Sequence, residues 1–192
     1  MSESTMSGFQ LSPQQKHLWL LGAEESAFHA AVAVLLEGKL EVETLKSALE
    51  AVVSRHEILR TTYRMVHDHP VQVISPEVTI SLPTIDLSAL NGERQLEEAR
   101  KIVQEESAKG FNLSSDPMLR GCILKLGEQD HILFLNTHHI ASDGWSSGVM
   151  VNDLCSFYKA ALENQPASLP ELEIQYADYA SWQRNYLQGE YR

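Results

Sequence analysis

NTHHIASDGWSSG, residues 136–148, decides how the chain is expected to fold. It follows an apolar run that predicts a buried strand, and two adjacent histidines, His138 and His139, lie where that strand should end. Neighbouring side chains of a strand point to opposite faces, so the two rings cannot have the same role. Asp143 is a good N-cap for a following helix, and Gly144 allows a tight turn or a close backbone approach.

Three interpretations of this stretch compete. The first is structural, with a core histidine whose ring nitrogens are hydrogen-bonded, an N-cap aspartate and a turn glycine. The second is a metal site, which we disfavour because adjacent histidines on opposite strand faces make poor joint ligands and no other His or Cys cluster is spaced to help. The third is a catalytic histidine, since imidazole titrates near neutral pH and is the usual general base, with Asp143 to orient it.

The elements around this stretch alternate between the two types of secondary structure. Residues 118–127 and 130–139 predict two strands joined as a hairpin, and a helix with an apolar stripe follows from about Trp145. Upstream, the periodicity predicts helices from Pro13, over 41–56 and over 93–110, and strands over 28–38, 58–66 and 69–75. A last helix is predicted from Tyr176. This order predicts an α/β layered sandwich with a mixed sheet and helices.

The composition narrows the class of protein. The chain has 192 residues and a net charge of −11, which argues against a general nucleic-acid binder. Cys122 and Cys155 are expected to be reduced core thiols. Residues 1–10 are polar and predict a flexible lead without a signal peptide, and no apolar run approaches the ~18 residues of a membrane span. We expect a cytoplasmic protein without a membrane partner.

The histidine stretch resembles the HHxxxDG signature of the condensation domains of nonribosomal peptide synthetases. Three further stretches resemble motifs of that family in the right order: LSPQQKHLWLL (11–21), RHEILRTTY (55–63) and YADYASWQ (176–183). GFNLSSDPMLR (110–120) also resembles a stretch that leads into the strand before the histidines. The resemblance therefore covers residues 11–183.

The resemblance implies a chloramphenicol acetyltransferase-like fold, in which two similar α/β lobes enclose an active-site tunnel. Residues 11–192 are expected to form the N-terminal lobe, with the C-terminal lobe absent from this chain. The partners implied are that second lobe, a downstream adenylation region, and the carrier proteins that deliver donor and acceptor.

The reaction implied is amide-bond formation. A donor acyl or peptidyl thioester and an acceptor aminoacyl group are each carried on a 4′-phosphopantetheine arm, and no cofactor is bound directly. His139 matches the second histidine of the motif and would remove a proton from the acceptor amine or hold the amine in place. His138 takes the opposite strand face, where we expect packing and hydrogen bonding.

The resemblance also assigns supporting roles to nearby residues. Asp143 is expected to pair with an arginine, with Arg60 as the first choice, or to cap a helix, and both could hold. Arg55 is either part of the site or a solvated charge at a helix end. The Gly144 amide is expected to face the developing oxyanion, and Trp145 is expected to be a packing anchor.

Two alternatives to this function stay open. One is a non-catalytic module that docks carrier proteins or a second lobe. The other is a small-molecule acyltransferase that uses acyl-CoA. In the leading interpretation the isolated lobe is expected to be inactive, because half of the tunnel is missing.

Overall fold

The apolar run before the histidine pair forms a central strand of a four-stranded sheet in the computed structural model, which describes residues 8–22 and 26–189. The helices are α1 (Pro13–Leu21), α2 (Val42–Arg55), α3 (Gly92–Ala108), α4 (Gly144–Leu162) and α5 (Tyr176–Gln188). The strands are β1 (Phe9–Gln10), β2 (His29–Glu37), β3 (Thr61–Val66), β4 (His69–Ile74), β5 (Thr84–Asp86), β6 (Leu119–Lys125) and β7 (Asp130–His138). Two short 3-10 turns, η1 (Ser26–Phe28) and η2 (Glu57–Arg60), precede β2 and β3.

The larger sheet has the strand order β2-β7-β6-β5. β7 is antiparallel to both β2 and β6, whereas β5 runs parallel to β6. The predicted mixed sheet and the hairpin of residues 118–139 are therefore confirmed.

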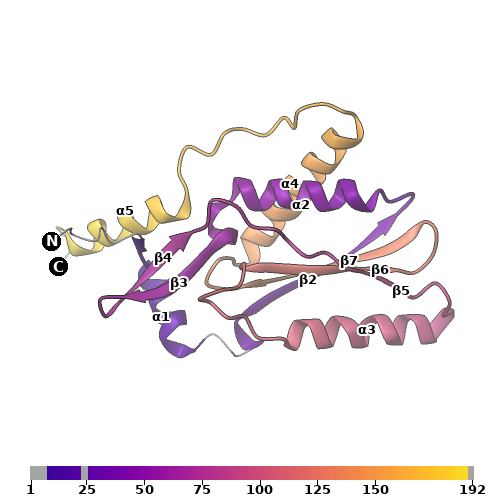
Figure 1. Cartoon of the computed structure of the whole chain (residues 1–192), viewed down its shortest axis with the longest axis horizontal. Coiled ribbons are helices and arrows are strands. Elements are labelled where there is room, and N and C mark those ends of the chain that lie inside the picture. Colours follow the sequence, from indigo (N-terminus) through magenta and orange to yellow (C-terminus); the bar gives the residue numbers. More distant parts are fainter. Residues whose placement is uncertain (1–7, 23–25, 190–192) are drawn as a thin grey trace.

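Alternation along β7 explains why helices cover both faces of this sheet. Leu133 and Leu135 pack with α2 and α4 in the largest core cluster, whereas Phe134 packs with Ala99 of α3 on the other face. Figure 1 shows α2 and α4 on one side of the sheet and α3 on the other. A strand buried on both faces has few polar positions, which is why the sequence before the histidines is an apolar run.

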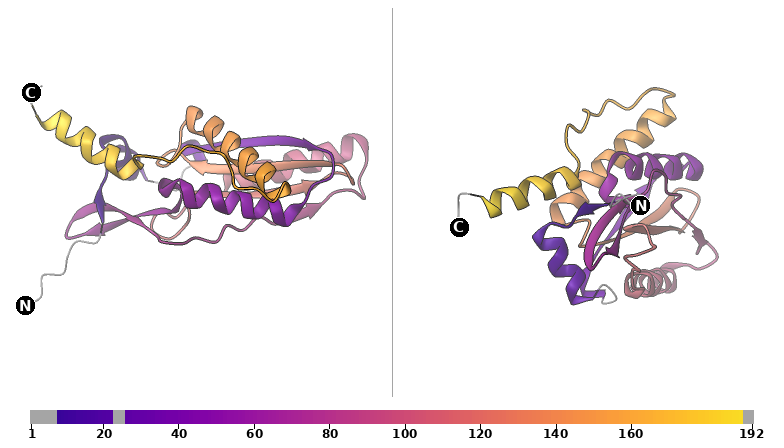
Figure 2. Two further views of the ribbon diagram at one scale, coloured as in Figure 1. Left: turned by 90° about the horizontal axis from the view of Figure 1, so that it is seen from above. Right: turned by 60° about the vertical axis from the view of Figure 1, so that its left-hand side comes forward.

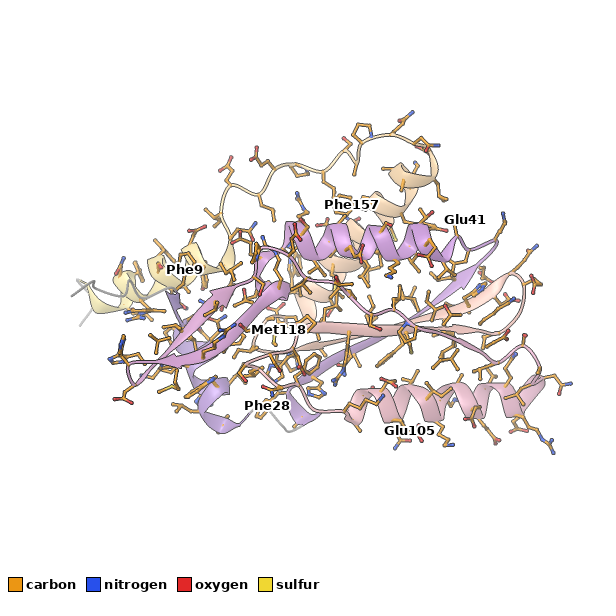
Figure 3. The ribbon with its side chains drawn as sticks, in the orientation of Figure 1. Phe9, Phe28, Glu41, Glu105, Met118 and Phe157 are labelled. Atoms are coloured by element: carbon orange, nitrogen blue, oxygen red, sulfur yellow. The ribbon has the colours of Figure 1, made fainter. Side chains whose placement is uncertain are left out.

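A smaller sheet, of order β1-β4-β3, lies beside the first and is covered by α1. Met118, which has no exposed surface, joins the two sheets through its backbone. Its N–H donates to the Leu59 carbonyl before β3, and its carbonyl accepts from His138 N–H at the end of β7. Figure 3 labels Met118 where the two sheets meet. The end of β7 is thus fixed at the junction of the two sheets.

The predicted capping box of α1 is present, because Ser12 and Gln15 each bond the other's backbone N–H. At the other end of the chain, α5 projects from the body after a long crossing segment (Figure 2). Its ring side chains form successive contacts from Tyr176 through Tyr179 and Trp182 to Tyr186.

Two helices bury faces that differ from those predicted by the periodicity of the sequence, which are Leu96, Ala99 and Val103 in α3 and Met150, Leu154, Phe157 and Ala161 in α4. Leu96 of α3 is 47% exposed, because Gln95 takes the inward position and its amide donates to the carbonyls of Leu87, Leu90 and Leu126. Ala161 and Cys155 of α4 are exposed, since α4 buries a narrower stripe than the sequence suggested.

The predicted lead divides into two parts. Residues 1–7 lie outside the described residues. Phe9 and Gln10, which the composition predicts to be flexible, form β1 by pairing with Gln72 and Val71 of β4.

Candidate active site

The two histidines are separated by the end of the strand. β7 ends at His138, and His139 is the first residue of the turn that leads to α4. The His139 N–H donates to the Phe28 carbonyl over 2.7 Å, and the Ala141 N–H closes the turn on the His138 carbonyl over 2.9 Å. The backbone of the turn is therefore hydrogen-bonded on both sides of the His139 side chain.

The His139 ring is exposed and has a defined tautomer. Its Nδ1 lies 3.2 Å from the Ser142 carbonyl oxygen. A carbonyl only accepts hydrogen bonds, so Nδ1 carries the proton and Nε2 keeps its lone pair. The ring is thus oriented with its basic nitrogen available to a ligand.

His138 is fully buried and packs as predicted. Its Nδ1 accepts from the Ile140 N–H over 3.0 Å, which places the proton on Nε2. The ring contacts Phe111 and His29, each at a centroid distance of 5.8 Å. Burial, together with the neighbouring His29 and His139, lowers the pKa of His138 from 6.5 to about 4.

The buried His138 makes stability depend on pH. Its pKa is lower in the folded state, so the unfolded state binds more protons between pH 6.5 and about 4. The free energy of unfolding should therefore fall by about 3 kcal/mol as the pH falls through this window. Urea unfolding at a series of pH values measures it.

A matched pair of variants separates this effect from general acid denaturation. His138→Gln should flatten the slope between pH 6.5 and about 4, whereas His17→Gln, at an exposed position on α1, should leave it unchanged. An unchanged slope in His138→Gln would assign the acid sensitivity to other groups.

Gln15 and Tyr63, which belong to the first and second motifs, support the turn, although neither was predicted to be a site residue. The Gln15 side chain is buried and donates to Tyr63 Oη over 3.2 Å and to Gln72 Oε1 over 3.0 Å. Tyr63 Oη in turn donates to the carbonyl of Ile140, next to His139, over 3.4 Å. The signal for this network was that both residues belong to family motifs, but the sequence does not show that they contact each other.

Asp143 is the N-cap of α4. Its Oδ1 accepts from the Ser146 backbone N–H over 2.8 Å and from Ser146 Oγ over 2.6 Å. These hydrogen bonds lower the pKa of the Asp143 carboxyl, so it stays ionised at neutral pH. The predicted cap is present, whereas the predicted pair with Arg60 is wrong.

The two arginines of the second motif contact other partners. Arg60 donates to the Ser75 carbonyl and pairs with Glu57 at 3.2 Å, because it lies at the end of η2 beside β4. Arg55 is not a solvated charge, since its Nε lies 3.1 Å from Oδ2 of the buried Asp153 on α4. Arg55 therefore fastens α2 to α4.

His139 opens onto a cavity of about 560 Å³. The wall beside it comes from the turn and the start of α4, including Ser142, Asp143 and Trp145. Trp145 is 83% exposed, so the prediction that it is a packing anchor within this chain is wrong.

The other predicted site residues do not line this cavity. Gly144 begins α4, and a Cβ there would meet no atom within 4 Å, so the described residues do not need a glycine for space. His138, Arg55 and Arg60 are likewise absent from the cavity lining.

No group of three or more His, Cys, Asp or Glu residues within 8–22 and 26–189 is placed to hold a metal ion. In the same part of the chain, no helix combines the length and the apolar character needed to cross a membrane.

The layered arrangement of the sheet and its helices is the chloramphenicol acetyltransferase-like fold. A family model described as the condensation domain matches residues 7–192, and the chain belongs to that family.

Curated relatives of the chain are peptide synthetases. It is 38% identical over 180 residues to one of the linear gramicidin synthase proteins of Brevibacillus parabrevis, which covers 92% of this chain and 4% of that protein. It is 37% identical over 180 residues to phosphinothricin tripeptide synthetase PhsC of Streptomyces viridochromogenes, covering 92% of this chain and 17% of the relative. The chain thus spans only a small part of the relatives it matches.

Solved structures agree with the fold. The X-domain from teicoplanin biosynthesis, in its complex with OxyB, is 30% identical with a TM-score of 0.85, over 98% of this chain and 40% of that chain. SgcC5 of Streptomyces globisporus is 28% identical with a TM-score of 0.82, over 94% of this chain and 42% of that chain. The starter condensation domain of rhizomide synthetase RzmA, at 20% identity and a TM-score of 0.84, shows the same fold.

Proposed function

We propose that this chain is the N-terminal lobe of a peptide-bond-forming condensation domain. The observation that carries the proposal is the His139 ring, exposed at a cavity with Nδ1 bonded to the Ser142 carbonyl. That arrangement presents a basic Nε2 to the cavity, in a chain that belongs to the condensation family.

The reaction has a simple balance of atoms. The amine nitrogen of a carrier-bound aminoacyl group attacks the carbonyl carbon of a carrier-bound thioester, so that a C–N bond forms and the C–S bond breaks. His139 Nε2 holds the amine or takes its proton, and the departing thiolate takes up one proton.

The predicted oxyanion role of Gly144 remains part of the proposal. Gly144 is the first residue of α4, where backbone N–H groups are free of intrahelical partners. The helix dipole and the first-turn N–H groups other than that of Ser146, which donates to Asp143, favour a negative charge at that position. The donor and acceptor carriers, their phosphopantetheine arms, a second lobe and an adenylation region are the partners that the proposal requires.

A docking module without chemistry is the second candidate. The X-domain of teicoplanin biosynthesis, 30% identical to this chain, was solved in a complex with OxyB, so a related domain takes part in a protein complex. The exposed rings of Trp145 and Trp182 give this chain an apolar surface for such a contact.

A reconstitution assay tests the proposed function. We expect no dipeptide product from the 192-residue chain with two loaded carrier proteins, because one lobe supplies only part of the substrate tunnel. Joined to the second lobe of its parent, the chain should form the product. Carrier binding without product in the two-lobe protein would favour the docking module, and product from the single lobe would contradict the need for a second lobe.

A further inference from the structure

The cavity in front of His139 has a second imidazole in its wall. His56, the residue after α2, lines it with a side chain that is 20% exposed. His56 contacts Asp153 of α4. His139 contacts the carbonyl of Ser142, the residue before Asp143, which is the N-cap of the same helix. Ten residues of α4 separate the two aspartates, or roughly 15 Å of helix axis, so the imidazoles mark two ends of the cavity.

His56 is held in one orientation by a buried carboxylate. Its Nε2 donates to Asp153 Oδ2 over 2.8 Å, and the Asp153 side chain is only 7% exposed. A carboxylate accepts, so Nε2 carries the proton and Nδ1 of the neutral ring keeps a lone pair. Among the described residues, no hydrogen bond uses His56 Nδ1.

The core does not require a histidine at this position. Arg55 Nε donates to the same Asp153 oxygen over 3.1 Å, so the charge of the buried carboxylate is already compensated. The α2–α4 connection would persist with a residue other than histidine at position 56. Packing and charge compensation therefore do not require the oriented Nδ1 of His56.

The walls around His56 are apolar. Ile58 and Leu59 of η2 and Met150 of α4 line the cavity with it. An apolar pocket with one oriented hydrogen-bond acceptor is the arrangement by which binding sites select one group by shape and polarity.

We propose that the His56 end of the cavity is a specificity pocket for the side chain of one of the two reacting groups, the donor or the acceptor. It takes a side chain with an apolar body and an O–H or N–H donor, which bonds to His56 Nδ1. This inference rests on the proposed function, because it needs substrates that present a side chain while their reacting atoms lie at His139.

Binding to the chain itself is the first test. The probes are two pairs of pantetheine amides, threonine with valine and tyrosine with phenylalanine. The two members of each pair differ chiefly by a hydroxyl group. In calorimetry, one hydroxyl-bearing member should bind about tenfold more tightly than its partner. His56→Phe should remove that difference, and His17→Phe, an exposed control on α1, should keep it.

Two results would overturn the inference: equal affinities within both pairs, or a preference that survives in His56→Phe. His56→Gln serves as a second variant if His56→Phe unfolds, because a glutamine amide can still donate to Asp153 and offer an acceptor. It should retain part of the preference.

Condensation by the two-lobe protein separates this inference from the proposed function. The threonine–valine and tyrosine–phenylalanine pairs are tested first as donors and then as acceptors. At one of these two positions kcat/KM should be higher for the hydroxyl-bearing substrate than for its partner, and His56→Phe should bring the ratio of the two kcat/KM values close to one. Product formation without such a ratio overturns the specificity pocket alone. Preferential binding without any product overturns the proposed condensation alone.

Discussion

Replacing His139 by alanine should abolish dipeptide formation by the two-lobe protein. The imidazole is the oriented base at the cavity, and its removal leaves the Ser142 carbonyl without that donor. General-base assistance is typically worth about 10²–10⁴-fold, so kcat should fall at least 100-fold while carrier binding is retained. Single-turnover assays with preloaded carriers measure the chemical step without carrier exchange.

The fold should tolerate this substitution, because the His139 side chain is exposed and its backbone N–H keeps its bond to Phe28. His17→Ala, which changes an exposed histidine on α1, is the matched control and should keep full activity. A His139→Ala protein with unchanged kcat would refute the proposed role. A protein that loses activity and also unfolds would leave His139 a structural residue instead.

The α/β sandwich was predictable because the hydrophobic periodicity of the sequence agrees with the positions that are buried in the structure. β7 is buried on both faces and reads as an apolar run, α2 places Leu45, Leu49 and Val52 on one buried stripe, and Ser12 with Gln15 forms the expected capping box. The separation of the two histidines was predicted, but for a different reason. The sequence placed both on opposite faces of one strand, whereas β7 ends at His138 and His139 is exposed in the turn beyond it.

The partners of the charged residues were not predictable from the sequence. Asp143 and Arg60 each lie in a family motif, but local geometry gives Asp143 the Ser146 amide of its own helix and gives Arg60 the Ser75 carbonyl at the end of β4. The buried Asp153, in a turn of α4 outside every motif, became the partner of Arg55 and His56 only when the helices packed. Such long-range pairs leave no periodic trace in the sequence.

Gly121→Ala should destabilise the chain more than any single change on its surface. Gly121 lies in β6 opposite Leu135 of β7, and a Cβ there would collide with the Phe134 carbonyl and come within 2.7 Å of Leu135 Cδ2. A backbone carbonyl in a central strand cannot move without breaking the ladder, so the free energy of unfolding should fall by about 3 kcal/mol. Urea unfolding measures the difference.

Gly144→Ala is the matched control, since it adds the same methyl group at a position with no atom within 4 Å. It should change stability by no more than about 1 kcal/mol, in the stabilising direction, because alanine favours a helix over glycine. The contrast also bears on the site. Leu135 lies three residues before His138, so a shift of β7 that accommodates Gly121→Ala would displace the turn that holds His139. A Gly121→Ala protein as stable as Gly144→Ala would mean that β6 and β7 separate easily at this point, and that the turn is held by the Gln15 and Tyr63 network instead.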